Sequence, residues 1–239
     1  FHNITKGIEI SFLSDIPTKG SGLGSSSAVV VGLLNALYAY KGESISSKDL
    51  AHLAVRIELD VLRKPIGVLD QHIAVLGGLR AIEFTPGGKT IGRRLLMDES
   101  VKEDLNNSLM LVYTGIVRKA EDVLGSFSVD EHLPLLHQNK VFAQNGTEML
   151  LRGNLKGFGE IFDKYWNIKK SLMEKVSNNE IDTMYKLAKD AGAIGGKVIG
   201  AGGGGFLLVM FPANKKAKVK EALKDYKELP FRFSDIGSK

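Results

Sequence analysis

The stretch Gly20-Ser21-Gly22-Leu23-Gly24-Ser25-Ser26-Ser27-Ala28 decides how the first part of this chain folds. Three glycines alternate with other residues, three serines follow, and the apolar run of residues 29–40 begins directly after them. This run predicts a helix that starts within the serines, and residues 7–13 upstream predict a strand. Glycines let successive N–H groups point into one concavity, and a helix start adds unpaired donors and a positive dipole end. The stretch therefore predicts an anion site suited to phosphates.

Two commoner phosphate loops do not fit this stretch. A Walker A loop would close on Gly-Lys-Ser or Gly-Lys-Thr, and no such triplet closes it here. A dinucleotide fingerprint would need its last glycine where the chain has Ser25. A plain turn or flexible linker is the commoner origin of a glycine–serine cluster, but the long apolar helix that starts inside the serines favours phosphate binding.

The composition of the chain is that of an ordinary globular protein. Its 239 residues are enough for one large domain or two small ones, with 44% hydrophobic and 25% charged residues. No segment approaches the roughly 18 apolar residues that a membrane-spanning helix needs, so we expect no membrane partner. Cysteine is absent, which excludes disulfides, thiolate catalysis and cysteine zinc sites and is typical of a cytoplasmic protein.

The net charge of +5 favours anionic ligands in a general way. The lysines concentrate in one late segment, which also carries apolar residues at helical spacing. We interpret these lysines as the solvated face of a helix rather than as a nucleic-acid surface, because no aromatic residues interleave with them. They are Lys215, Lys216, Lys218, Lys220, Lys224 and Lys227.

Helices and strands alternate along the rest of the chain, which predicts a protein of the α/β or α+β class. Ser46 to Asp49 predict the capped start of a second helix, and a short third helix is expected over residues 68–76. The polar stretch at residues 97–107 predicts a boundary between a domain of residues 1–103 and one of residues 104–239. Strands are expected at residues 80–84, 91–96, 109–113 and 206–211, and near Phe231.

Phosphoryl transfer needs a phosphate cradle, a magnesium site and a group that orients or deprotonates the acceptor hydroxyl. One of the serines at positions 25–27 can give a hydroxyl to Mg²⁺, which prefers hard oxygen ligands together with a carboxylate. Two carboxylates, Glu58 and Asp60, lie on opposite shoulders of the apolar stripe of the second helix. Periodicity does not choose between them.

Asp70 is a different kind of carboxylate, because it lies among apolar residues between Gly67 and Gly77. Such an acid is usually capping or paired, but burial can also raise its pKa toward the range of a general base. A second glycine run, residues 200–205, leads into a strand and fits either a close backbone approach or a flexible hinge. The five histidines make no metal-ligand pattern, and no serine lies in a nucleophile elbow.

With these motifs in place, the chain resembles the GHMP small-molecule kinases, the superfamily of galactokinase, homoserine kinase, mevalonate kinase and phosphomevalonate kinase. Pro17 with Gly22 to Ala28 resembles the phosphate-loop motif of that family, and Lys197 to Gly205 resembles its C-terminal glycine motif. Further stretches resemble the members that act on heptose phosphate. These are Ile57 to Asp60, Pro65 to Gln71, Gly77 to Leu79, Tyr165 to Lys170 and Gly195 to Lys197.

The resemblance implies an α+β fold with a ribosomal-protein-like N-terminal domain, which binds ATP, and a ferredoxin-like C-terminal domain. It also implies first strands that have no counterpart in these 239 residues. Asp70 matches the aspartate that orients or deprotonates the acceptor hydroxyl, and Ser26 and Glu58 match the magnesium ligands. The ATP phosphates would lie on Gly22, Leu23, Gly24, Ser25, Ser26 and Ser27. Weaker candidates for substrate binding are Gly202 and Gly203, together with Arg118, Lys169 and Lys170, which would bind the phosphate that the substrate already carries.

The implied activity is an ATP- and Mg²⁺-dependent transfer to the anomeric hydroxyl of D-glycero-D-manno-heptose 7-phosphate, for cell-surface glycan synthesis. A fucokinase- or galactokinase-like sugar-1-kinase and a non-catalytic nucleotide-binding relative are the alternatives. The expected ligands are thus a sugar phosphate and ATP, with no nucleic acid, in a cytoplasmic monomer or homodimer.

Overall fold

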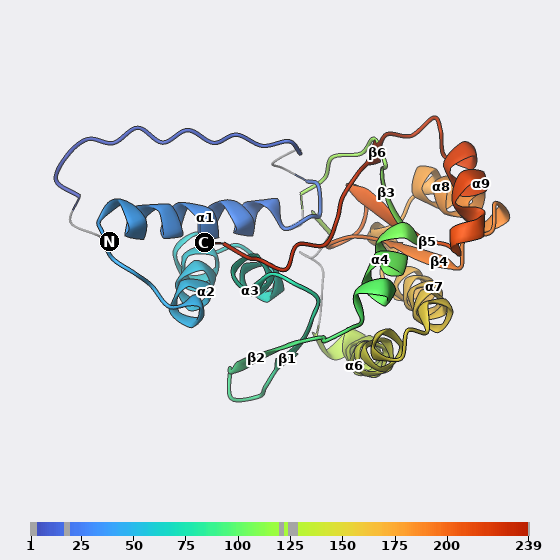
Figure 1. The fold of residues 1–239 in the computed structure, drawn as a ribbon, viewed down its shortest axis with the longest axis horizontal. Helices are drawn as coiled ribbons and strands as arrows, with labels where there is room; N and C mark the ends of the chain where they lie inside the picture. The colour runs from blue at the N-terminus through green and yellow to red at the C-terminus, as the bar shows by residue number, and fades with distance from the viewer. Residues whose placement is uncertain (1–3, 17–19, 120–121, 124–128, 239) are drawn as a thin grey trace.

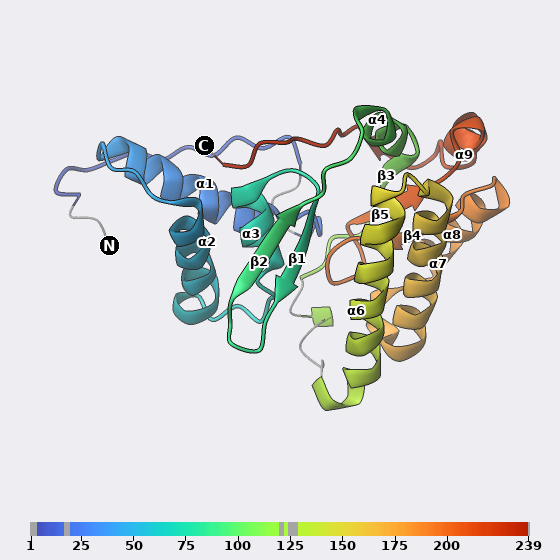
Figure 2. The ribbon, with the colours of Figure 1, turned by 60° about the horizontal axis from the view of Figure 1, so that its bottom comes forward.

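The computed structural model describes residues 4–16, 20–119, 122–123 and 129–238. Three helices lie together at one end of the molecule, and a four-stranded sheet with its helices lies at the other (Figure 1). A two-stranded hairpin lies between these two ends (Figure 2). This combination of separate helices and antiparallel sheets confirms the α+β class. Pro17, the first residue of the expected phosphate-loop motif, lies outside the described residues.

The helices α1 (Ser25–Tyr40), α2 (Ser47–Arg56) and α3 (Leu69–Leu76) pack against one another at the N-terminal end. The Ser46 side chain accepts a hydrogen bond from the Asp49 N–H at 3.1 Å, so the predicted cap of α2 is confirmed. The first helix also starts within the serines, as predicted. The shared core consists of Val31, Leu34, Leu50, Ala51, Ala54 and Val75.

The strand expected at residues 7–13 is wrong. Residues 4–16 run as irregular chain beside α1 (Figure 1), and their apolar side chains are exposed. Ile10 and Phe12 are 46% and 55% exposed. A strand needs a neighbour for its backbone hydrogen bonds and for its apolar face, and the described residues offer it none. Residues 7–13 therefore have the sequence of a strand, but no neighbouring strand among the described residues pairs with them.

The hairpin joins β1 (Arg80–Phe84) to β2 (Thr90–Arg94) in antiparallel register, with Phe84 opposite Thr90. The second strand is shorter and earlier than the expected residues 91–96. The helix α4 (Glu99–Asn107) then occupies the polar stretch in which we place the domain boundary, and that boundary stays a prediction.

The sheet at the other end has the strand order β4-β5-β3-β6, and all its pairs are antiparallel. Its central strands β3 (Leu109–Tyr113) and β5 (Phe206–Met210) are almost entirely buried, which fits their unbroken apolar sequences. The edge strands are β4 (Gly195–Val198) and β6 (Glu228–Leu229), so the last strand lies slightly before the expected Phe231.

Among the described residues, this sheet is accompanied by α6 (Val129–Leu151), α7 (Leu155–Leu172), α8 (Asn179–Asp190) and α9 (Lys216–Ala222). The helix α7 packs on β4 and against α6, while α8 packs on β5 and α9. On the lysine-rich α9, Val219 is buried, and Lys220 forms an ion pair with Glu228 at 2.8 Å. Lys216, Lys218 and Lys220 thus lie on a helix with a buried apolar side, as predicted, whereas Lys215, Lys224 and Lys227 lie outside α9. The absence of a nucleic-acid surface stays a prediction.

The C-terminal segment returns from the sheet to the N-terminal helices, as Figures 1 and 2 show. The Gly78 N–H donates to the Ser234 carbonyl and the Ser238 N–H donates to the Ala74 carbonyl, both at 2.8 Å. These backbone bonds tie the end of the chain to α3 and so connect the two ends of the molecule.

Candidate functional site

The two glycine runs of the sequence meet in space. A Cβ atom on Gly22 would lie 2.5 Å from the Ile199 carbonyl oxygen, and one on Gly200 would lie 2.9 Å from the Cα of Gly22. A Cβ on Gly205 would likewise overlap the Ser21 carbonyl. The second run therefore permits a close backbone approach between two loops, which is the first of the two readings left open by the sequence.

The first glycine loop leads into α1 as expected for an anion site. Gly20, Gly22 and Gly24 all have φ near +70°, a conformation that glycine adopts without strain. Gly24 directly precedes α1, and neither a capping side chain from the described residues nor an acidic residue occupies the first turn of that helix. The N–H groups at the helix start are thus left for a ligand, with the positive end of the helix dipole behind them.

Glu58 lies fully buried in a π-helical turn, Ile57–Val61, that continues α2. Asp60 in the same turn is exposed, so the structure separates the two acids that periodicity leaves equivalent. The hydroxyl of Ser26 donates to Glu58 Oε1 at 2.9 Å, and the other carboxylate oxygen accepts at 2.6 Å from both Ser27 and Gln71. Burial acts to raise the pKa of Glu58, but these bonds and one from Lys64 outweigh it and hold the pKa below its usual value.

Lys64 completes this arrangement. Its ammonium donates to Ser26 Oγ at 2.6 Å and to Glu58 Oε1 at 3.0 Å, so it bridges the two side chains expected to hold Mg²⁺. A hydroxyl and a carboxylate are oxygen ligands of the kind that Mg²⁺ prefers, and the donor set therefore fits that ion. The Lys64 side chain is 29% exposed, which leaves it room to move aside.

Lys64 and Gln71 are site residues that the sequence reasoning missed. Lys64 reaches Glu58 because the chain turns back between the two, with Arg63 at φ 50° and the Lys64 N–H bonded to the Glu58 carbonyl at 2.9 Å. No sequence pattern marks that turn beyond the following Pro65. Gln71 follows Asp70 directly, but a neutral amide gives no signal of its own.

Asp70 lies against the first glycine loop. A Cβ on Gly24 would be 3.3 Å from Asp70 Oδ2, so the carboxylate faces the start of α1. Leu69 and Ile73 beside it are 47% and 37% exposed, and Asp70 as a whole residue is exposed. Partial burial of the carboxylate beside the loop still raises the pKa of Asp70, and the negative charge of Glu58 raises it further.

The second glycine run brings together two of the three cations expected near the substrate. The ammonium of Lys169 donates to the Gly200 carbonyl at 3.3 Å, and the Arg118 guanidinium donates through Nε to the Gly202 carbonyl. Lys170 instead forms an ion pair with Asp182 of α8 at 3.0 Å. A third cation, Lys197 of β4, lies near Lys169 in place of Lys170, and sequence reasoning gave it no role.

Gly202 and Gly203, the glycines expected to contact substrate, pack against the chain itself. The Gly203 N–H donates to the Val176 carbonyl at 2.6 Å. A Cβ on Gly202 would lie 2.8 Å from the Val176 Cβ. Their lack of side chains is thus accounted for by the neighbouring turn, while the Gly202 carbonyl positions Arg118.

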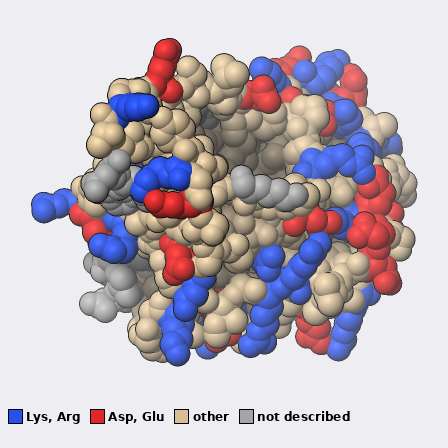
Figure 3. All heavy atoms as spheres, turned by 60° about the vertical axis from the view of Figure 1, so that its left-hand side comes forward, with Lys and Arg blue, Asp and Glu red and all other residues tan. Residues whose placement is uncertain are grey.

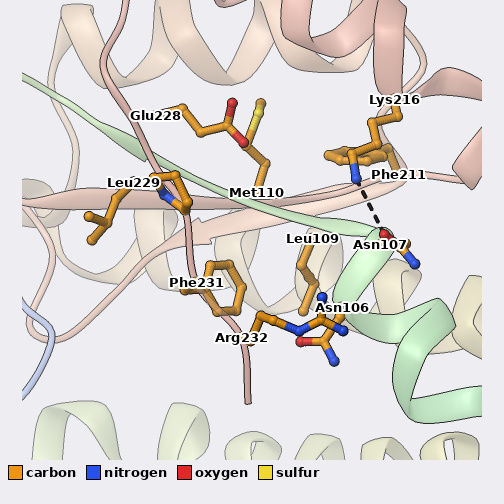
Figure 4. A pocket seen from close by; sticks show the side chains of 11 residues that line it. Asn106, Asn107, Leu109, Met110, Phe211, Lys216, Glu228, Leu229, Phe231 and Arg232 are labelled. Atoms are coloured by element: carbon orange, nitrogen blue, oxygen red, sulfur yellow. Dashed lines mark hydrogen bonds between the residues drawn. The ribbon is translucent and has the colours of Figure 1, made fainter. Parts of the chain in front are cut away.

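A pocket of about 200 Å³ lies elsewhere, between α4, β3 and residues 228–232 (Figure 4). None of the residues of the two glycine loops, and none of Glu58, Lys64, Asp70, Arg118 and Lys169, lines it. Both cations of its lining have partners: Lys216 donates to Asn107 at 3.5 Å, and Arg232 forms an ion pair with Glu103, which lies outside the lining. This pocket therefore lacks the chemistry of the glycine-loop site.

Two features are absent from the described part of the chain. No cluster of three or more histidine, cysteine or acidic residues suited to a metal ion occurs there. No helix there has the length and apolar character needed to cross a membrane. On the face seen in Figure 3, basic and acidic side chains are interspersed and do not gather into one basic surface.

Both ends of the molecule match models of one family. Residues 1–78 match the GHMP kinases N terminal domain, and residues 147–229 match the GHMP kinases C terminal domain. A D-glycero-alpha-D-manno-heptose 7-phosphate kinase from Campylobacter jejuni is 34% identical over 88% of this chain and 63% of its own length. An L-fucokinase/L-fucose-1-P guanylyltransferase from Bacteroides fragilis is 30% identical over 85% of this chain and 22% of its own length.

A solved structure agrees with these matches. The D-glycero-D-manno-heptose 1-phosphate kinase from Bacteroides thetaiotaomicron superposes with a TM-score of 0.76 at 28% identity, over 93% of this chain and 64% of the other. The present chain thus spans less than two thirds of each of these three relatives. With its two glycine loops in contact and both family domains matched, the chain belongs to the GHMP kinase family.

Proposed function

We propose that this protein is an ATP- and Mg²⁺-dependent kinase that phosphorylates the anomeric hydroxyl of D-glycero-D-manno-heptose 7-phosphate, giving the 1,7-bisphosphate. One observation carries the proposal. The Asp70 carboxylate lies against Gly24, at the open start of α1, and the Ser26–Glu58 pair adjoins the same helix start. A cradle for phosphates, an acid to act on a hydroxyl and hard oxygen ligands therefore converge, which is what phosphoryl transfer requires.

Each part of this arrangement has a role in the proposal. The residues Gly22 to Ser27 bind the phosphates of ATP through backbone N–H groups and the α1 dipole. Mg²⁺ on Ser26 and Glu58 neutralises phosphate charge when bound. Asp70 orients the acceptor hydroxyl and accepts its proton at the carboxylate, and its raised pKa makes it a stronger base than an ordinary aspartate. Positioning and electrostatics supply most of the rate enhancement.

The acceptor is proposed from the relatives. The Campylobacter relative and the Bacteroides thetaiotaomicron structure both carry names of heptose phosphate kinases. The fucokinase relative supports a second candidate, an unphosphorylated sugar phosphorylated at the anomeric position. A phosphate already present on the acceptor is the chemical difference between these two candidates.

A coupled assay of ATP consumption with the full-length protein tests the proposal. The acceptors are heptose 7-phosphate, L-fucose, D-galactose and mevalonate, each assayed with ATP and Mg²⁺. We expect a kcat/KM for heptose 7-phosphate at least about a hundredfold above the others, a discrimination that charged hydrogen bonds can supply. Faster turnover of fucose or galactose would instead establish the second candidate. ATP binding without turnover of any acceptor would identify a non-catalytic relative.

A further inference from the structure

Three cations from different parts of the fold meet beside the second glycine run. Lys169 comes from α7, Lys197 from β4, and Arg118 from the segment after β3. The ammonium groups of Lys169 and Lys197 lie 5.9 Å and 4.7 Å from the centre of the same Tyr165 ring. Arg118 and Lys169 both donate to carbonyls of the second glycine run, Gly202 and Gly200. We call these three residues the cation cluster.

The positive charge of the cation cluster has no counterion within the described residues. None of the ion pairs found there includes any of its members. Lys169 is only 7% exposed, and Nη2 of Arg118 is buried without a hydrogen-bond partner. By contrast, the neighbouring Lys170 is paired with Asp182, and Lys189 of α8 is paired with Asp163 at 2.9 Å.

The electrostatics of Lys169 agree with this geometry. Desolvation, followed by repulsion from Lys197 and Arg118, lowers the pKa of Lys169 to about 8. Desolvation likewise lowers the pKa of Lys197 and of Arg118. Buried cations are ordinarily paired, because an unpaired buried charge is unfavourable. The cluster is therefore complete only when an anion enters it.

A phosphate monoester fits the donors that this cluster presents. A guanidinium offers a planar fork for two phosphate oxygens, and ammonium groups bind phosphate as compact point charges. The position is also suitable. A Cβ atom on Gly200 would lie 3.3 Å from Arg118 Nη2 and 2.9 Å from the Cα of Gly22. The cluster thus adjoins the first glycine loop across a single glycine.

We propose that Arg118, Lys169 and Lys197 bind the phosphate that the acceptor sugar already carries. The inference rests on the proposed kinase function and deepens it, because it assigns the recognition of a phosphorylated acceptor to these side chains. The phosphates of ATP have their own donors in the first glycine loop and the start of α1. The cation cluster adjoins that loop, with the Arg118 backbone against Gly20 and Arg118 Nη2 beside Gly200, and its uncompensated charge is assigned to a second phosphoryl group.

The test compares two methionine substitutions on α7 in the full-length enzyme. Lys169→Met removes a charge of the cluster and preserves side-chain length. Lys156→Met is the matched control, because Lys156 lies on the same helix, is 80% exposed and is about 20 Å away at 1.5 Å per residue. Steady-state KM values are measured for heptose 7-phosphate and for ATP. Calorimetry without ATP measures the binding of heptose 7-phosphate and of inorganic phosphate.

We expect Lys169→Met to raise the KM for heptose 7-phosphate at least about tenfold, with the KM for ATP within twofold of wild type. Lys156→Met should leave both values unchanged. A rise in the KM for ATP alone would overturn the proposal and assign the cluster to nucleotide phosphates. Unchanged KM values for both substrates would overturn it as well.

Two further measurements distinguish a loss of acceptor binding from a loss of folding or of catalysis. Lys169→Met should melt no lower than wild type, because it removes a buried charge that has no counterion among the described residues. Lys197→Met provides a second test of the cluster. If the wild-type enzyme fails to turn over heptose 7-phosphate, the proposed function fails. In that case the inference still stands if calorimetry detects binding of heptose 7-phosphate that Lys169→Met weakens. It falls if the wild-type protein shows no binding, or if wild type and Lys169→Met bind equally tightly.

Discussion

Glu58 and the cation cluster both adjoin the first glycine loop and the start of α1, and they differ in how their charge is balanced. Glu58 receives hydrogen bonds from Ser26, Ser27, Lys64 and Gln71, so its negative charge is matched within the chain. The cluster of Arg118, Lys169 and Lys197 receives no carboxylate from the described residues.

The part of the site that depends on a ligand is the one whose charge the chain leaves unbalanced. The pKa of Glu58 is lowered in spite of its burial, whereas the pKa of Lys169 is lowered because of burial and like charge. The lowered pKa of Glu58 means that its charged, deprotonated form is stabilised. The lowered pKa of Lys169 means that its charged, protonated form is destabilised. The Glu58 arrangement therefore stabilises the fold as it stands, and the cation cluster gains stability when an anion binds.

The largest expected effect concerns Asp70, whose raised pKa depends in part on the negative charge of Glu58. Asp70→Asn should lower kcat by about 10²- to 10⁴-fold, because the amide cannot accept a proton from the acceptor hydroxyl. The KM for ATP should stay near the wild-type value, since Asp70 faces the acceptor in this account. Stopped-flow or steady-state assays with heptose 7-phosphate measure both constants, and undiminished turnover would remove Asp70 from the mechanism.

Glu58→Gln should be the most damaging change for stability. It removes the charge around which four donors are arranged, and we expect a loss of about 1–3 kcal/mol in the free energy of unfolding. It should also raise the Mg²⁺ concentration needed for half-maximal activity, because a carboxylate ligand is lost. Urea unfolding and Mg²⁺ titration measure these two effects. Equal stability together with an equal Mg²⁺ requirement would contradict the role given to Glu58.

Lys64→Met should change the Mg²⁺ requirement in the opposite direction. The Lys64 ammonium bonds to Ser26 and Glu58, so it competes with a divalent ion for the same oxygens. Its removal should lower the half-saturating Mg²⁺ concentration several-fold in the same titration. A higher requirement than in wild type would indicate that Lys64 assists metal or phosphate binding.

The pH dependence of acceptor binding should distinguish Lys169 from other lysines. With its pKa near 8, Lys169 is charged below that pH and loses its charge as the pH rises through 8. The groups facing it are Lys197, Arg118 and the Tyr165 ring. The KM for heptose 7-phosphate should therefore rise above about pH 8 in wild type. In Lys169→Met this rise should be absent, and a rise that persists in the variant would assign the titration to another group.

The smallest expected effect belongs to Lys170. The family resemblance gives Lys169 and Lys170 the same role, but the structure pairs Lys170 with Asp182. Lys170→Met should therefore cost at most about 0.5–1 kcal/mol of stability, as for other partly exposed ion pairs. Its effect on the KM for heptose 7-phosphate should be much smaller than that of Lys169→Met. An equal effect of the two substitutions would place Lys170 in the cluster.

Local patterns predict much of the fold. The cap at Ser46, the start of α1 within the serines and the apolar strands β3 and β5 follow from neighbouring residues alone. The strand expected at residues 7–13 fails for a non-local reason, because pairing depends on a partner strand. The two readings of the second glycine run also needed tertiary structure, since only the contact between Gly22 and Gly200 decides between them.

The candidate site is less predictable than the fold. Glu58 and Asp60 are equivalent by α-helical periodicity, and a π-helical turn that no simple pattern predicts buries the first and exposes the second. Lys64 reaches the site through the turn at Arg63, and Lys197 reaches it from the edge strand β4. Their importance depends on which charges lie near them, and sequence spacing alone does not give those distances.

The position of the new phosphate on the sugar can be read from the product of a single reaction. The full-length protein is incubated with ATP, Mg²⁺ and D-glycero-D-manno-heptose 7-phosphate, and the phosphorus NMR spectrum is recorded. The account predicts a new resonance from a phosphate at the anomeric carbon, with the 7-phosphate retained and one ADP formed per product. Recovery of unchanged heptose 7-phosphate, under conditions in which an unphosphorylated sugar is converted, would contradict it.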